Sequence, residues 1–365
     1  MSNRQVKSVS IGDGYHYEYG NFGKKKWEDI IRLFADANVY QTWSYGQVRW
    51  GIGNLQHLLL YLDEQLVAAV QIRIVRIPIV GGGIAYISSG PMTNRFDCDP
   101  ESEVLKWMLR ALYLEFVIKK KLYLRIVPFI VDNNKIEIPR IFLDEKFKKD
   151  HSASKYRTFL NDLSPSLDEL MMGLKKKWRY DLRRAKQENL VVTGGTGLEF
   201  YQAFKELYLE MHDRKQFVES VDINDFEKIH KDLSEDLKFQ ILIVSFENKP
   251  VSASVWSGIG NTGIEILSAT GGLGLKLRSS FFLKWSMLES MKLHGCLYID
   301  QGGVDPIKNP GGYHYKKGLG GVDIQHLGTF WACENFMSNV FVYLAEFLKR
   351  NYIKIKKNGI LGKNR

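Results

Sequence analysis

The sequence predicts an α/β protein built from two similar halves, each a mixed, largely antiparallel sheet flanked by helices. The chain has 365 residues, more than one ordinary hydrophobic core supports, so two domains of similar size are expected. Apolar residues make up 45% of the chain and charged residues 25%, which is typical of a globular protein. A third observation is an order of strands and helices that occurs twice along the chain.

The first copy of this order follows an amphipathic helix expected at residues 24–37, where tryptophan, isoleucine and phenylalanine recur at helical spacing. Apolar and β-rich runs predict two strands joined by the turn Asp63-Glu64-Gln65, then a strand, a helix and a last strand with alternating residues. In order, these five elements are expected at 58–62, 66–77, 84–88, 101–119 and 122–130.

The second copy repeats this order roughly 180 residues later, a domain-sized period. Its turn is Glu247-Asn248-Lys249. Its elements are expected at 239–246, 251–259, 264–269, 277–293 and 296–300. The sequence therefore predicts a first domain at 1–160 and a second at 161–350 that begins with a basic helical segment. A basic, disordered tail is expected at 351–365.

Composition restricts the partners and the compartment. The net charge of +10 suits an anionic partner such as nucleic acid, a nucleotide or a membrane surface. Cys98, Cys296 and Cys333 lie far apart and match no metal-ligand spacing, so reduced thiols in a cytoplasmic protein and no metal site are expected. The first residues contain no apolar signal segment, and no apolar run approaches the length of a membrane span.

The strongest candidate site lies where the last expected strand ends. Asp300 closes that strand and is followed by Gly302 and Gly303, which let a substrate approach the backbone. About a dozen residues later, Lys316 and Lys317 stand among aromatic residues and glycines, an arrangement expected to form a turn that binds anions. The alternatives are a capped strand end and a solvated basic loop.

A second candidate is the basic segment between the halves, expected as a helix that starts at Ser164-Pro165. Lys175, Arg179 and Arg183 are spaced by four residues and share one ridge, which favours binding of a phosphate, a diphosphate or a nucleic-acid backbone. The alternative is a solvated helix face. Arg49, between two tryptophans, is a further candidate for anion binding.

Together these pieces resemble the FemABX aminoacyltransferases from residue 40 to residue 328, in the order of that family. The matching pieces are Gln41-Thr42-Trp43, Tyr86-Ile87-Ser88-Ser89-Gly90-Pro91, Trp178-Arg179-Tyr180-Asp181-Leu182-Arg183-Arg184-Ala185, Tyr298-Ile299-Asp300-Gln301-Gly302-Gly303 and Tyr315-Lys316-Lys317-Gly318-Leu319-Gly320. The resemblance implies two tandem GNAT-like domains. It also implies transfer of an amino acid from aminoacyl-tRNA to the stem peptide of a UDP- or lipid-linked peptidoglycan precursor, with no further cofactor. Peripheral contact with the inner face of the membrane is a further expectation.

The resemblance also implies roles for individual residues. Tyr315-Lys316 replaces the Phe-Lys of the family, and Arg49 falls near a lysine that binds precursor phosphate in some members. Lys316 is then expected to stabilise the oxyanion of acyl transfer, with Tyr315 positioning the substrate. Asp300 is expected to accept a proton or orient the amine, and Lys317 is the alternative to Lys316.

Two other functions fit the same sequence. The chain also resembles GNAT acetyltransferases of exopolysaccharide or cell-envelope sugar pathways, which implies an acyl-CoA donor. The diphosphate of the CoA would be bound by the backbone amides of residues 269–274, which precede an expected helix. The other function is non-catalytic nucleic-acid binding through the basic helix.

Overall fold

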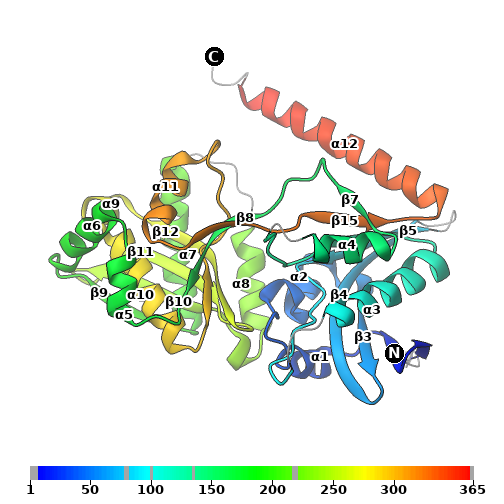
Figure 1. Cartoon of the computed structure of the whole chain (residues 1–365). Coiled ribbons are helices and arrows are strands. Elements are labelled where there is room, and N and C mark those ends of the chain that lie inside the picture. Colours follow the sequence, from blue (N-terminus) through cyan, green and yellow to red (C-terminus); the bar gives the residue numbers. More distant parts are fainter. Residues whose placement is uncertain (1–6, 78–81, 99–101, 134–135, 216–220, 362–365) are drawn as a thin grey trace.

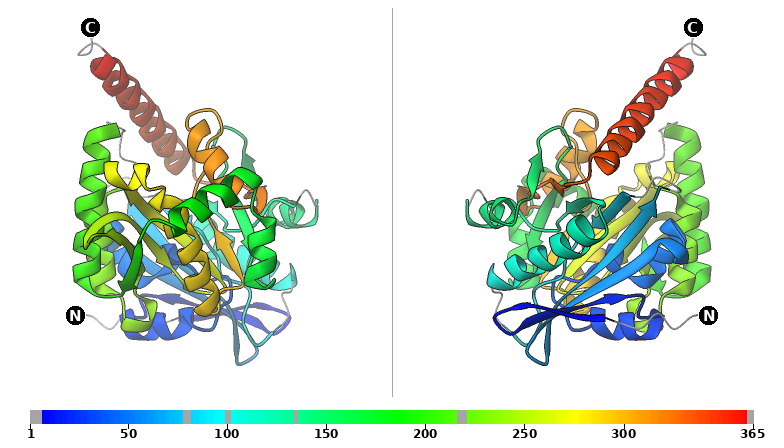
Figure 2. Two further views of the ribbon diagram at one scale, coloured as in Figure 1. Left: turned by 90° about the vertical axis from the view of Figure 1, so that its left-hand side faces the viewer. Right: turned by 90° about the vertical axis from the view of Figure 1, so that its right-hand side faces the viewer.

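The computed structural model describes residues 7–77, 82–98, 102–133, 136–215 and 221–361, and side chains up to residue 348 and at residue 351. Two mixed sheets lie side by side, each flanked by helices (Figures 1 and 2). This confirms the predicted α/β fold class of two mixed, largely antiparallel sheets flanked by helices.

The first sheet has eight strands in the order β1-β2-β3-β4-β5-β6-β15-β7. Its neighbours pair antiparallel, except for the parallel pair β5–β6. The strands are β1 Lys7–Gly12, β2 Tyr15–Gly20, β3 Leu55–Leu62, β4 Gln65–Arg76, β5 Gly83–Ser88, β6 Tyr123–Val127, β7 Lys148–Asp150 and β15 Thr329–Ala332. The helices of this half are α1 Lys24–Ile31, α2 Trp43–Trp50, α3 Ser102–Leu112, α4 Glu137–Asp144 and α12 Phe336–Leu361, with short turns η1 Val39–Gln41 and η2 Ile52–Asn54 and a π-helical continuation of α3, η3 Tyr113–Lys119.

The second sheet has seven strands in the order β14-β8-β13-β12-β11-β10-β9, and its one parallel pair is β12–β13. The strands are β8 Arg157–Asp162, β9 Val191–Gly195, β10 Gln240–Phe246, β11 Lys249–Ser257, β12 Thr262–Thr270, β13 Tyr298–Asp300 and β14 Val322–Gln325. The helices are α5 Leu167–Gly173, α6 Lys176–Lys186, α7 Leu198–Lys215, α8 Ile223–Asp232, α9 Gly272–Lys276, α10 Ser279–Leu293 and α11 Pro310–Gly318, with the turn η4 Glu235–Leu237.

The two repeated hairpins form at the positions expected from the sequence. β3–β4 and β10–β11 pair antiparallel across the two expected turns. In the second turn Glu247 and Asn248 have φ values of 49° and 62°. Two consecutive left-handed residues suit the right-handed twist of the strands that they join.

The two halves exchange equivalent strands. β8 follows β7 in the chain but pairs between β13 and β14 of the second sheet, and β15 follows β14 but pairs between β6 and β7 of the first. The two connections touch where His326 N–H donates to the Tyr156 carbonyl over 2.9 Å (Figure 1). The expected division at residue 160 therefore does not follow the sheets: it falls inside β8, and β15 and α12 lie on the first half.

One hydrophobic core joins the halves. It packs Trp27, Phe34 and Trp43 of the first half with Phe204 and Ile229 of the second. Ion pairs cross the same boundary, among them Arg32 with Asp236 at 2.6 Å and Lys24 with Asp232 at 3.2 Å. The halves are thus held by apolar burial as well as by the exchanged strands.

Some element ends differ from expectation. The first helix ends at Ile31 instead of residue 37. α12 continues to Leu361, through most of the stretch expected as a disordered tail, whose residues 362–365 lie outside the described residues. In the part of the chain that the structure describes, no helix is both long and apolar enough to cross a membrane.

Candidate functional site

Asp300 is the last residue of β13, near the middle of the second sheet, with β12 on one side and β8 on the other. Its side chain is 1% exposed. Its Oδ1 accepts three hydrogen bonds, from Thr158 Oγ1 at 2.6 Å, from the Gly302 amide at 2.8 Å and from the Tyr156 hydroxyl at 3.0 Å. The carboxylate therefore fixes the loop that follows it against β8.

Burial raises the pKa of Asp300 above its ordinary value, although these hydrogen bonds and the charge of Lys316 act in the opposite direction. The same carboxylate contributes to the raised pKa of Tyr156, which is due first to burial. It also contributes, after burial and Tyr45, to the raised pKa of Tyr40. Since Tyr40 belongs to the first half, Asp300 lies near the boundary between the halves.

Lys316 lies on a helix and not in the expected turn. Asn309 caps α11 by accepting from the Gly312 amide, and Pro310 occupies the first turn. Lys316 Nζ donates to the Gly302 carbonyl at 3.2 Å and to the Gly303 carbonyl at 3.3 Å. The structure thus brings Lys316 to the loop that Asp300 holds.

The neighbours of Lys316 point elsewhere. The Tyr315 hydroxyl donates to the Ser280 carbonyl at 2.6 Å, and its ring packs near Trp178 and Phe281, so Tyr315 anchors α11 to α10 and α6. Lys317 is exposed, with its Nζ 5.8 Å from the centre of the Tyr313 ring. On this helix, Lys316 faces the Asp300 loop and Lys317 faces solvent.

Gly302 is required by close packing. Its φ is 77°, and a Cβ there would come within 2.9 Å of the Glu265 carbonyl. A side chain would also crowd Lys316 Nζ, 3.3 Å from the same point. A larger residue would therefore move the loop away from α11.

A buried ion pair beside this loop was missed by the sequence analysis. Lys284 of α10 pairs with Glu265 of β12, and their side chains are 3% and 7% exposed. Lys316 Nζ lies 4.0 Å from the same Glu265 carboxylate. Burial lowers the pKa of Lys284. In the sequence, the only sign of this ion pair is that Glu265 and Lys284 each stand inside a stretch of apolar residues.

The basic segment forms two helices, α5 and α6, that meet at Leu174 and Lys175. The first begins at Ser166 and not at Ser164, because Ser166 and Glu169 form a reciprocal capping box. Arg179 Nη2 donates to the carbonyls of Met172 and Leu174, both at 3.0 Å. Arg179 thereby caps the end of α5.

The remaining cations of the predicted ridge, Lys175 and Arg183, are exposed. The Lys175 amide donates to the Gly318 carbonyl at 3.0 Å, so the start of α6 adjoins the end of α11. Arg49 lies outside this group: its Nη1 is 2.7 Å from Asp225 of α8, an ion pair between the halves.

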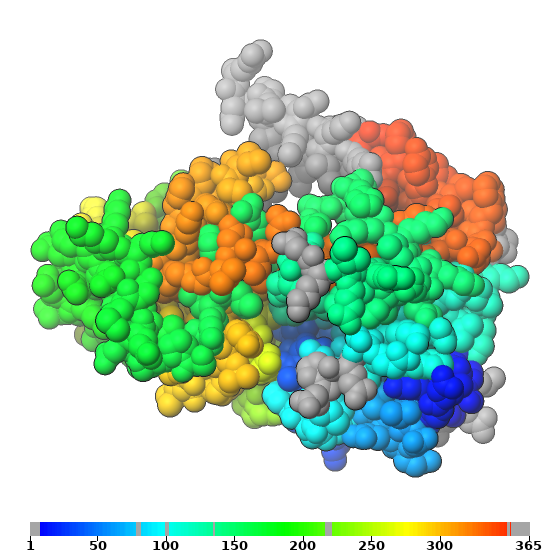
Figure 3. All heavy atoms as spheres, viewed as in Figure 1, coloured from blue at the N-terminus to red at the C-terminus, as the bar shows by residue number. Residues whose placement is uncertain are grey.

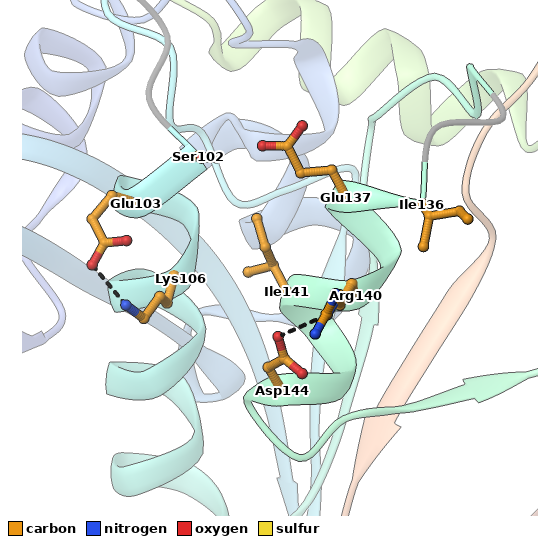
Figure 4. Close-up of a pocket in the computed structure, with 8 residues that line it drawn as sticks. All are labelled: Ser102, Glu103, Lys106, Ile136, Glu137, Arg140, Ile141 and Asp144. Carbon is orange, nitrogen blue, oxygen red and sulfur yellow. Dashed lines mark hydrogen bonds and ion pairs between the residues drawn. The ribbon is translucent and has the colours of Figure 1, made fainter.

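One surface hollow lies beside the candidate site and another lies apart from it, on the first half. One is lined by Asn161, Leu170, Gly173, Gly320 and Gly321, beside the candidate site, since Asn161 accepts a hydrogen bond from Gln301 at 2.7 Å. The other lies between α3 and α4 and shares no residue with the site (Figure 4). Four of its charged residues already pair, Glu103 with Lys106 and Arg140 with Asp144. Within the described residues, no group of His, Cys, Asp or Glu is placed to hold a metal ion.

The sequence matches no protein-family model and no curated protein. Among solved structures, FemX superposes with a TM-score of 0.73 at 15% identity, over 87% of this chain and 98% of FemX. The chain has the fold of FemX. The C-terminal domain of a putative lysylphosphatidylglycerol synthetase from Agrobacterium fabrum superposes with a TM-score of 0.50 at 12% identity, over 88% of this chain and 93% of that domain. A conserved protein of unknown function from Bacteroides thetaiotaomicron also has a TM-score of 0.50, at 14% identity, over 86% of this chain and 98% of that protein.

Proposed function

We propose that this protein is an aminoacyltransferase that moves an amino acid from aminoacyl-tRNA to the stem peptide of a UDP- or lipid-linked peptidoglycan precursor, as in cross-bridge formation. The observation that carries the proposal is a lysine held at a buried carboxylate loop, in a chain that shares the FemX fold over nearly its whole length. The family resemblance of the motifs that form this loop supports the choice of substrates.

The reaction joins the acceptor amine to the ester carbonyl of the donor. A C–N bond forms, the C–O bond to the tRNA breaks, and the released hydroxyl takes up a proton while the amine loses one. Lys316 stabilises the developing oxyanion or the terminal phosphate of the donor. Asp300 acts as a positioning residue, because its Oδ1 holds Tyr156, Thr158 and the Gly302 amide while the next carbonyls hold Lys316.

The exposed cations of α6 supply the anion-binding surface of the proposal. Lys175 and Arg183 point to solvent from a helix whose start adjoins α11. They bind phosphates of the tRNA or the precursor. Arg179 supports them by joining α5 to α6.

An acyl-CoA donor has less support. The expected diphosphate site lies at the start of α9, where the Gly272 amide donates to the Glu210 carboxylate at 2.8 Å. A phosphate would have to displace that carboxylate.

The experiment is a donor and acceptor screen with two lysine variants. Purified protein is offered labelled aminoacyl-tRNAs and acyl-CoAs against UDP-linked and lipid-linked precursors. Lys316→Met should lower the single-turnover rate by about 10²–10³, as for other single donors to an oxyanion, and Lys317→Met should act as the matched control with a small effect. Transfer only from acyl-CoA, or a Lys316→Met rate near that of the wild type, would contradict the proposal.

A further inference from the structure

Helix α12 has two faces of opposite character. One face packs on the first sheet through residues spaced by four: Ser338, Val342 and Glu346. Ser338 Oγ donates to the Lys121 carbonyl at 2.7 Å, and Glu346 pairs with Arg125 of β6. This face fixes the helix to the body of the molecule.

The opposite face is apolar and exposed. Its exposed fractions run from 37% at Phe341 to 75% at Phe336. It consists of Phe336, Met337, Phe341, Tyr343, Leu344, Phe347 and Leu348. Helix α12 projects from the edge of the molecule (Figure 2). The part of the helix up to residue 348 forms part of the outer surface in the space-filling view (Figure 3). So many apolar side chains on one projecting face indicate a contact surface.

Charge indicates what this face contacts. The sequence contains no acidic residue after Glu346, and Glu346 is already paired with Arg125. The basic residues that follow are Lys349, Arg350, Lys354, Lys356, Lys357, Lys363 and Arg365. Lys121, whose carbonyl accepts a hydrogen bond from Ser338 of the helix, is also exposed. Aromatic and aliphatic residues flanked by cations suit an anionic bilayer surface, where rings enter the headgroup region and lysines meet phosphates.

We propose that α12 docks this protein onto an anionic lipid bilayer, with the helix lying in the plane of the interface and its outward apolar face in the headgroup region. A second copy of the chain would cover the apolar face but would bring the two basic stretches near each other, which like charges oppose. The proposal does not depend on the proposed function, because it concerns binding to lipid and not transfer.

The test measures partition of the full-length protein onto vesicles of phosphatidylcholine, with and without phosphatidylglycerol, by co-sedimentation at two salt concentrations. The protein should bind the anionic vesicles, and salt should weaken binding. The variant Leu344→Gln/Phe347→Gln should lower the partition coefficient by at least about tenfold, because two apolar side chains are removed from the contact. The matched control is Leu209→Gln/Leu293→Gln, two exposed helical positions of the second half, 47% and 91% exposed, whose exchange should leave partition unchanged.

The proposal would be overturned if the protein did not bind anionic vesicles, or if the two double variants partitioned equally. It would also be overturned if vesicle binding were absent and the protein formed a concentration-dependent dimer that Leu344→Gln/Phe347→Gln abolishes. The last outcome would assign the face to self-association. Circular dichroism of the variants checks that they remain folded, and transfer to a water-soluble acceptor stays available as an independent measure of the proposed function.

Discussion

At the residue scale, the candidate site contains several buried charges in a small volume. Glu265 pairs with Lys284 and lies 4.0 Å from Lys316, which itself donates to the loop after Asp300. A buried carboxylate between two ammonium groups compensates charges that would otherwise be costly to bury. The ion pair thus supports the position of Lys316. Among the described hydrogen bonds, none joins the pair to the Asp300 carboxylate.

The first prediction concerns this pair. Glu265→Gln should lower the free energy of unfolding by about 3–5 kcal/mol, because it leaves Lys284 buried and uncompensated. The double variant Glu265→Gln/Lys284→Met should recover most of that loss, since both charges are then gone. Urea unfolding measures both. Glu103→Gln, in an exposed pair, is the control, with a loss of at most about 1 kcal/mol. Additive losses in the double variant would contradict this account.

The second prediction concerns His57, which is fully buried, stacks on Trp27 with ring centres 4.0 Å apart, and contacts Gln71. Burial lowers its pKa from 6.5 to about 3. Because His57 takes up its proton more easily in the unfolded chain, the free energy of unfolding is highest above pH 6.5, where His57 is neutral in both states. This part of the stability is lost as the pH falls toward 3.

The measured quantity is the slope of the free energy of unfolding against pH. His57 should contribute about 1.4 kcal/mol per pH unit below pH 6.5, and His57→Phe should remove that contribution while keeping an aromatic ring. His151→Phe, at an exposed position, controls for the loss of a histidine as such. An unchanged slope in His57→Phe would show that the pKa of His57 is the same in the folded and the unfolded state, which would contradict the lowering of its pKa by burial.

At the element scale, the sequence predicted the strands of both hairpins and β5, β6, β12 and β13, because a run of apolar residues is a local signal, but not β1, β2, β7, β8, β9, β14 or β15. The hairpin β10–β11 and the strand end at Asp300 were predicted in this way. α11 was missed, since three glycines suggested a turn; the Asn309 cap, Pro310 and the burial of Leu319 favour a helix there. The contact of Lys284 with Glu265 is not local, so no periodicity could indicate it.

The third prediction separates two arginines that the sequence placed on one ridge. Arg183 is exposed, whereas Arg179 caps α5. Arg183→Ala should raise KM for the anionic substrate with little change in kcat or in the melting temperature. Arg179→Ala should lower the melting temperature as well, because two carbonyls lose their donor. Steady-state kinetics and thermal unfolding test both, and equal melting temperatures would assign the two arginines the same role.

At the scale of the whole molecule, β15 ties the first sheet to the second, because the chain completes the first sheet only after it has passed through the second. All strands of the second sheet lie between residues 157 and 325, whereas the first sheet requires β15 from beyond that segment. From the sequence, no strand is expected at β8 or β15, and even a recognised strand pattern says which face is buried and not which sheet the strand joins. The shared core then couples the halves further.

The last prediction is that the two halves unfold together. Urea unfolding followed by hydrogen-exchange mass spectrometry reports peptides of β3–β4 and β10–β11 separately, and both should give one midpoint. Phe142→Ala, in a core confined to the first half, should lower the midpoint of both sets of peptides by the same amount, with a loss of about 3–5 kcal/mol. Leu288→Ala, in a core confined to the second half, is the reciprocal variant and should also shift both. If either variant moved the midpoint of only its own half, the strand exchange and the shared core would hold the halves together without making them one cooperative unit.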